Sequence, residues 1–253
     1  MQFCVVIPAR YDSTRLPGKP LLNIAGKPMI QHVYERAKES KANQVIIATD
    51  DQRIVDAAAE FDAEVCMTSA DHRSGTERIS EVVTKTNLDD DAIVVNLQGD
   101  EPLMPPALIH QVAQNLHEHQ AASVATLQEQ IHTAGDLFDP HVVKVISDHS
   151  GYALYFSRAP IPWDRDAFSI STDELPQNAL HYRHVGLYAY RARFIKQYVD
   201  WPVCGLEQME SLEQLRVLWH GHKIHVASAV QPTESGVDTE KDLARVRQLL
   251  EKV

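Results

Sequence analysis

The first half of the chain alternates between short apolar runs and segments with helical periodicity, and this alternation restricts the fold more than any other feature. Runs at 3–7, 45–49, 64–67, 92–97 and 123–127 have the length and β-branched content of strands. Stripes of apolar residues at helical spacing lie between them. Such alternation predicts an α/β fold with a mostly parallel sheet, because parallel strands need crossover helices that cover both faces.

The pattern changes in the second half of the chain. The runs at 142–146 and 152–156 flank Ser150 and Gly151, which is typical of a hairpin. We expect a long loop over 164–180, a strand over 182–190 and one continuous helix over 206–219. A last strand at 223–230 and a last helix at 239–250 complete the chain. The second half therefore predicts an antiparallel portion attached to the parallel sheet.

Composition excludes several classes of protein. The 253 residues contain no internal repeat or low-complexity linker, so we expect a single domain spanning 1–253. The net charge of −11 argues against nucleic-acid binding, which needs a basic face. No apolar run approaches the ~18 residues of a membrane span, and no cationic leader precedes an apolar segment. Three distant cysteines without metal spacing fit a reducing cytoplasm.

A cationic loop follows the first strand. It carries Arg10, Arg15 and Lys19, with Ser13 and Thr14 between them. Three cations in one loop of an acidic protein repel each other unless an anion offsets them, and a polyphosphate suits that purpose. Ligands of open α/β sheets bind at the carboxyl ends of strands, which is where this loop lies. A solvated basic surface loop is the alternative.

An acidic segment follows the strand at 92–97. That strand delivers Gln98, Asp100 and Glu101 to the same sheet edge as the cationic loop. A carboxylate facing a phosphate site needs a bridging cation, and Mg²⁺ accepts few protein carboxylates and completes its shell with phosphate oxygens and water. Asp100 is thus the first candidate metal ligand. The alternative is an acid in a turn before Pro102.

A second candidate carboxylate lies near the C-terminus. Asp238, in the segment SGVDT at 235–239, directly precedes the last helix. The functional interpretation makes it a second metal ligand that the fold brings back to the site. The alternative is an N-cap of that helix.

Several motifs in order along nearly the whole chain support a family resemblance. They are PARYDSTRLPGKPL at 8–21, ATDD at 48–51, DHRSGTER at 71–78, NLQGDEP at 96–102, YFSRAPIPWDRD at 155–166, RHVGLYAYR at 183–191, LEQLR at 212–216 and GVDT at 236–239. Together they closely resemble the 3-deoxy-manno-octulosonate cytidylyltransferases, or CMP-Kdo synthetases.

The resemblance implies a Rossmann-like, GT-A-like nucleotidyltransferase fold and a Mg²⁺-dependent cytoplasmic homodimer. The implied reaction joins CTP and the sugar acid Kdo into CMP-Kdo and pyrophosphate, for lipopolysaccharide synthesis. A nucleotide part would span about 1–127, a sugar-binding and dimerisation part about 128–230, and a metal loop and helix 231–253.

The resemblance also implies roles for individual residues. Arg10, Lys19, Asp100 and Asp238 would be catalytic. Contacts to CTP would come from Pro8, Ala9, Arg10, Ser13, Thr14, Arg15, Lys19, Arg73, Ser74, Thr76 and Arg78. Contacts to the sugar acid would come from Gln98, Arg158, His184, Tyr188, Glu213 and Gln214, with Arg158 suited to the carboxylate by its planar fork.

Pattern alone leaves other interpretations open for some of these residues. Arg73 and Arg78 could lie on a helix surface, and His184 could be an ordinary strand histidine. Glu213 could form a surface ion pair with Arg216.

Other functions also remain possible at this stage. Another keto-acid sugar, such as 8-amino-Kdo or sialic acid, could replace Kdo. A non-catalytic nucleotide-binding protein is a different class of function. A third, NAD-dependent oxidoreduction, is disfavoured because the first turn lacks G-x-G-x-x-G.

Overall fold

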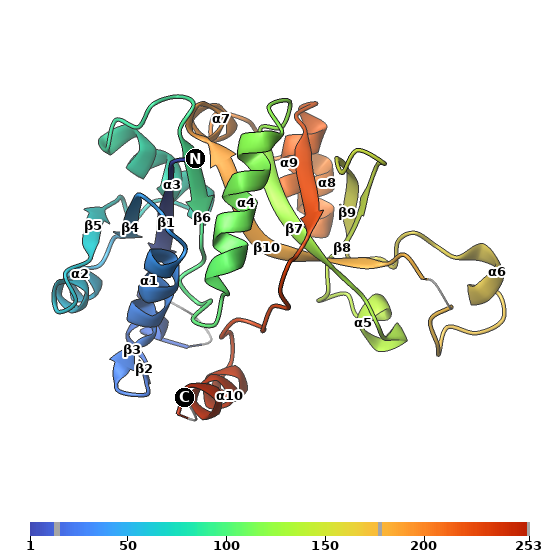
Figure 1. Cartoon of the computed structure of the whole chain (residues 1–253), viewed down its shortest axis with the longest axis horizontal. Coiled ribbons are helices and arrows are strands. Elements are labelled where there is room, and N and C mark those ends of the chain that lie inside the picture. The colour runs from blue at the N-terminus through green and yellow to red at the C-terminus, as the bar shows by residue number, and fades with distance from the viewer. Residues whose placement is uncertain (13–15, 177–178, 252–253) are drawn as a thin grey trace.

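The computed structural model describes residues 1–12, 16–176 and 179–251 (Figure 1). In the described part of the chain the main sheet has nine strands, seven of them in the order β11-β7-β10-β6-β1-β4-β5. The hairpin β8–β9 joins this sheet through β10. None of the helices in these ranges is long and apolar enough to cross a membrane.

The elements of the first half follow the predicted alternation closely. They are β1 (Phe3–Ala9), η1 (Lys19–Leu21), β2 (Asn23–Ile24), β3 (Lys27–Pro28), α1 (Met29–Glu39), β4 (Gln44–Thr49), α2 (Gln52–Ala59), β5 (Glu64–Met67), α3 (Gly75–Lys85), β6 (Ile93–Asn96), α4 (Pro106–Glu118) and β7 (Val124–Gln130).

The second half contains shorter helices. Its elements are α5 (Ala134–Phe138), β8 (Lys144–Ser147), β9 (Ala153–Ser157), α6 (Arg165–Phe168), β10 (Tyr182–Arg191), α7 (Ala192–Tyr198), α8 (Gly205–Glu210), α9 (Gln214–Trp219), β11 (Ile224–Ser228) and α10 (Glu240–Leu250). Figure 1 shows α5 and α6 projecting from the end of the sheet where β10 begins.

Strand directions confirm the predicted mixed sheet. The pairs β1–β4, β1–β6, β4–β5 and β7–β11 are parallel. The long strand β10 is antiparallel and lies between β6 and β7, where its register shifts between Val185 and Tyr188. The hairpin β8–β9 is antiparallel, as the sequence predicts. The irregular strand β10 therefore carries residues of the second half next to the loop that follows β6.

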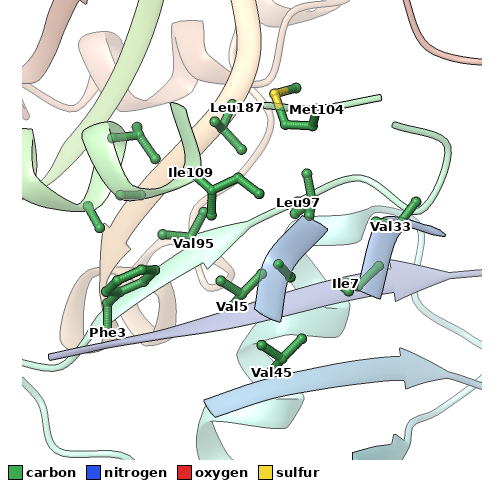
Figure 2. Packing of buried hydrophobic residues seen from close by; sticks show 14 of the residues in the cluster. Phe3, Val5, Ile7, Val33, Val45, Val95, Leu97, Met104, Ile109 and Leu187 are labelled. Carbon is green, nitrogen blue, oxygen red and sulfur yellow. The ribbon is translucent and has the colours of Figure 1, made fainter. Parts of the chain in front are cut away.

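Helices cover both faces of the sheet. On one face, alternate residues of β1 and β6 pack against α1 and α4, as Figure 2 shows for Val5, Val95 and Ile109. On the other face, residues such as Val6 and Val94 pack against α3, α7 and α9. Both central strands are therefore apolar on both sides, which explains the continuous apolar runs in the sequence.

The predicted single helix over 206–219 is wrong. The structure has two helices, α8 and α9, separated by Ser211 in the left-handed conformation with φ 52°. Arg216 Nε donates to Glu207 Oε2 at 2.6 Å. In a continuous helix these residues would stand about 13.5 Å apart along the axis. Met209, expected on the buried stripe, is 83% exposed. A long-range ion pair therefore overrides the helical periodicity.

The last helix brings the C-terminal segment back to the first loop. Val237, Leu243 and Val246 pack against Leu16, Ile24 and Met29 in a separate apolar cluster. Thr239 is the N-cap of α10 and forms a capping box with Asp242. The alternative in which Asp238 is the N-cap is therefore wrong. The Asp238 carboxylate instead accepts a hydrogen bond from Lys19, at the start of η1.

The loop after β6 presses on the end of β1 and requires a glycine there. A Cβ added at Gly99 would stand 2.8 Å from the carbonyl oxygen of Pro8. Because that oxygen belongs to the backbone, the strand ends would have to separate. We expect Gly99→Ala to lower the free energy of unfolding by about 1–3 kcal/mol, measured by urea denaturation. Gly205→Ala is the matched control, since an added Cβ there meets nothing within 4 Å. Equal stabilities for the two variants would contradict this explanation.

Candidate active site

A cavity of about 710 Å³ opens at the carboxyl ends of β1 and β6. Its lining comes from segments that are far apart in the sequence. Of the residues predicted from the sequence, the lining includes Pro8, Ala9, Arg10, Lys19, Thr76, Gln98, Asp100, His184, Tyr188, Glu213, Gln214 and Asp238. The cavity thus joins the expected nucleotide and sugar residues in one space.

Lys19 connects the two predicted metal carboxylates at one end of the cavity. Its Nζ donates to Asp100 Oδ2 at 2.7 Å and to Asp238 Oδ1 at 3.1 Å. Burial by itself would lower the pKa of Lys19, but the two carboxylates outweigh it and raise that pKa above its usual value. The ammonium therefore stays charged and holds both acids together.

Glu101 lies behind this cluster. Burial, together with the charges of Asp100 and Asp238, raises the pKa of Glu101 to about 8. A Cβ added at Gly236 would stand 2.8 Å from Glu101 Oε1 and 3.0 Å from the Asp100 carbonyl oxygen. The backbone N–H of Val237 donates to that same carbonyl at 2.9 Å. These contacts fix the C-terminal segment against the loop that carries Asp100.

The segment before α3 forms another wall. Arg10 donates through Nη2 to the carbonyl of His72, and Ser74 caps α3 by accepting from the N–H of Glu77 at 3.2 Å. Thr76, in the first turn, donates through Oγ1 to Glu213 Oε2 at 3.1 Å. The cap at Ser74 thus fixes the start of α3, and the first turn of this helix lines the cavity.

The opposite end of the cavity is aromatic and polar. The His184 ring packs against Phe156 and Tyr188 at 5.1 and 5.2 Å between centroids, and its Nε2 lies 3.0 Å from Thr126 Oγ1. Burial lowers the pKa of His184 to about 3. Burial also raises the pKa of Glu213 above its usual value. A neutral histidine ring and tyrosine rings therefore surround the Glu213 carboxyl group at this end.

Some lining residues were not predicted. Asn96, Tyr190 and Tyr198 all face the cavity. Asn96 Oδ1 has no hydrogen-bond partner among the described residues, and burial raises the pKa of Tyr190 well above its usual value. The alternation of Tyr188 and Tyr190 along one strand was a signal for two inward rings, but Tyr198 follows from the packing of α7 alone.

Four predicted residues lie outside the described lining of the cavity. Arg73 is mostly exposed, beside Glu77, and Ser74 caps α3. Arg78 is fully buried and pairs with Asp50 at 3.0 Å, so the surface interpretation is wrong for Arg78. Arg158 donates to backbone carbonyls of Glu210 and Pro140. Glu213 does not pair with Arg216, which bonds to Glu207. Ser13, Thr14 and Arg15, which were also predicted to contact CTP, lie outside the described residues.

Comparison with known proteins identifies the family of this chain. A family model described as cytidylyltransferase matches residues 4–224. A 3-deoxy-manno-octulosonate cytidylyltransferase from Pseudomonas fluorescens is 59% identical over 98% of both chains. One from Histophilus somni is 57% identical over the full length of both. The chain belongs to the 3-deoxy-manno-octulosonate cytidylyltransferase family. It is accordingly a nucleotidyltransferase, which sets aside the non-catalytic and NAD-dependent alternatives.

A solved structure gives the same result. It is described as CMP:2-keto-3-deoxy-manno-octonic acid synthetase complexed with CTP, and it matches with a TM-score of 0.90 and 44% identity over 100% of this chain and 99% of that one. A cytidylyltransferase from Leptospira borgpetersenii matches at a TM-score of 0.63 and 16% identity, which supports the fold alone. The predicted nucleotidyltransferase fold is confirmed.

The low pKa of His184 predicts a pH effect on stability. The folded protein keeps the ring neutral down to about pH 3, whereas the unfolded chain takes up the proton below about 6.5. The unfolded state therefore binds more protons in this window, and stability is lost as the pH falls. We expect the wild type to lose up to about 2 kcal/mol relative to His184→Gln between pH 6.5 and 5, by urea denaturation. His117→Gln, at the exposed end of α4, is the control for the removal of a histidine that is not buried. If the free energy of unfolding falls equally with pH in the wild type and in His184→Gln, the prediction is contradicted.

Proposed function

We propose that this protein transfers a cytidylyl group from CTP to 3-deoxy-D-manno-octulosonate (Kdo), giving CMP-Kdo and pyrophosphate. The observation that carries the proposal is the composition of the cavity. One end holds Lys19 with two carboxylates, and the other holds Glu213 and Gln214 with an aromatic wall. A triphosphate suits the charged end, and a polyhydroxylated sugar acid suits the other.

The donor set at the charged end fits a magnesium ion. Asp100 and Asp238 contribute carboxylate oxygens, which Mg²⁺ prefers, and a triphosphate would supply further ligands. Two carboxylates facing a triphosphate carry more negative charge than one ammonium neutralises. When bound there, Mg²⁺ would neutralise phosphate charge and lower the pKa of a coordinated hydroxyl.

The protein's own residues supply positioning and charge. Lys19 and Arg10 would contact the phosphates, with Arg15, Ser13 and Thr14 as further proposed donors. Transfer of a phosphoryl group requires mainly alignment and neutralisation of developing charge, so no covalent nucleophile is needed. The backbone of Pro8 and Ala9, with the start of α3, would face the cytosine.

The sugar end favours hydroxyl recognition. Glu213 offers acceptor oxygens, or a donor when protonated, and Gln214 offers both a donor and an acceptor. Gln98 donates to the Gly186 carbonyl at 3.2 Å, which aims its amide at this end. Kdo fits these groups, and 8-amino-Kdo or sialic acid is the alternative within the same reaction class.

Further parts of the proposal concern the cell and the assembly. We assign the protein to the cytoplasm, where its three cysteines, all unpaired here, would stay reduced. The product would serve lipopolysaccharide synthesis, and the active form would be a homodimer.

The choice of substrates can be tested directly. We expect pyrophosphate release from purified protein with CTP, Kdo and Mg²⁺, and at least about 100-fold lower kcat/KM with UTP or with sialic acid, because hydrogen-bonding groups in the site would be left unpaired. Release with 8-amino-Kdo exceeding that with Kdo would select the alternative sugar. No release with any sugar acid would refute the proposed reaction.

The carboxylate of Asp100 should be indispensable. We expect Asp100→Asn to lower kcat for pyrophosphate release by about 100-fold or more, because it removes charge from the site of phosphate transfer. Asp200→Asn, at an exposed position after α7, should keep wild-type activity. Near-normal turnover of Asp100→Asn at every Mg²⁺ concentration would show that the metal assignment is wrong.

A further inference from the structure

The break between α8 and α9 decides what the sugar end of the cavity contains. Ser211 and Leu212, at the break, and Glu213 and Gln214, at the start of α9, all line the cavity. A continuous helix would carry these four residues elsewhere. Ser211 adopts the left-handed conformation, which is unfavourable for a serine, so neighbouring contacts must hold the break in place.

One set of contacts holds the end of α8. The Glu210 carboxylate accepts from Ser157 Oγ at 2.6 Å and from the backbone N–H of Arg158 at 2.9 Å. Arg158 returns a bond, since its Nε donates to the Glu210 carbonyl at 2.7 Å, and its Nη1 donates to Pro140 at 2.9 Å. The guanidinium thus caps the C-terminal end of α8, which favours a cation.

A second set of contacts holds α9 and depends on the first. Glu207 of α8 pairs with Arg216 of α9, and both side chains are largely buried. The Arg216 guanidinium lies 4.6 Å from the Tyr198 ring centre, and the Tyr198 hydroxyl donates to the Glu213 carbonyl at 3.1 Å. Displacing α8 would therefore move α9 and with it Glu213.

We propose that Arg158 is a positioning residue that acts through Glu210, and that it is not the ligand of the sugar carboxylate. Arg158 and Glu210 together fix the break between α8 and α9, so that Glu213 and Gln214 present their side chains to the sugar acid. Glu210, for which the sequence suggested no role, is then as important as Arg158. The inference rests on the proposed sugar end of the cavity, but not on which sugar acid binds.

A double-mutant cycle separates positioning from direct binding. We expect Arg158→Gln and Glu210→Gln each to raise the KM for Kdo about tenfold, with the KM for CTP unchanged, and the double variant to be no worse than either single one. Arg193→Gln, which removes an exposed ion pair with Asp91, is the control. A near-normal Glu210→Gln beside a strongly impaired Arg158→Gln, or multiplied effects in the double variant, would overturn the proposal.

A measurement without substrate keeps this inference distinct from the proposed function. Amide hydrogen exchange over residues 205–219 should speed up at least about tenfold in both single variants and stay at wild-type rates in the control. Unchanged exchange in both variants would overturn the positioning role even if the enzyme makes CMP-Kdo. Failure of the wild type to use any sugar acid would instead refute the proposed reaction and leave the exchange result intact.

Discussion

One ammonium between two carboxylates holds the site together. Lys19, Asp100 and Asp238 come from the first loop, the end of a central strand and the C-terminal segment, and they meet within hydrogen-bond distance. Without the cation, two acids at this spacing would repel each other in a partly buried place. Because β6 and β1 are neighbours in the sheet, Lys19 and Asp100 lie side by side. The packing of α10 against Ile24 and Met29 brings Asp238 back to them.

The same charges explain how such a site could handle a triphosphate. An acidic cluster repels phosphate unless cations accompany it, and here the protein supplies Lys19 and Arg10 beside the acids. Glu101, whose pKa is raised to about 8, adds no full negative charge near neutral pH. Asp100 and Asp238 are then the two carboxylates left to bind a metal, few enough for a hydrated cation shared with a substrate. At the other end, a neutral His184 and tyrosine rings leave recognition to hydrogen bonds.

The strands and helices of the first half could be predicted because their signals are local, whereas most cavity residues were predicted through the family resemblance. Apolar runs indicate buried strands, and strand ends indicate where loops such as 98–101 converge. The helix break at Ser211 could not be predicted, since residues 206–219 keep helical spacing and no Gly or Pro interrupts them. Its cause is the contact of Glu207 with Arg216 and of Glu210 with Arg158, which periodicity does not reveal. The backbone partners of Arg158, the carbonyls of Glu210 and Pro140, could not be predicted for the same reason, because they come from distant segments of the chain.

The most direct test of the central claim is a crystal structure of the protein with CTP and Mg²⁺. The account predicts that Asp100 and Asp238 both coordinate a metal ion bound to the triphosphate, at about 2.1 Å, and that Lys19 turns toward the phosphates. A structure in which CTP occupies the cavity while the two carboxylates remain paired to Lys19, away from metal and phosphate, would contradict it.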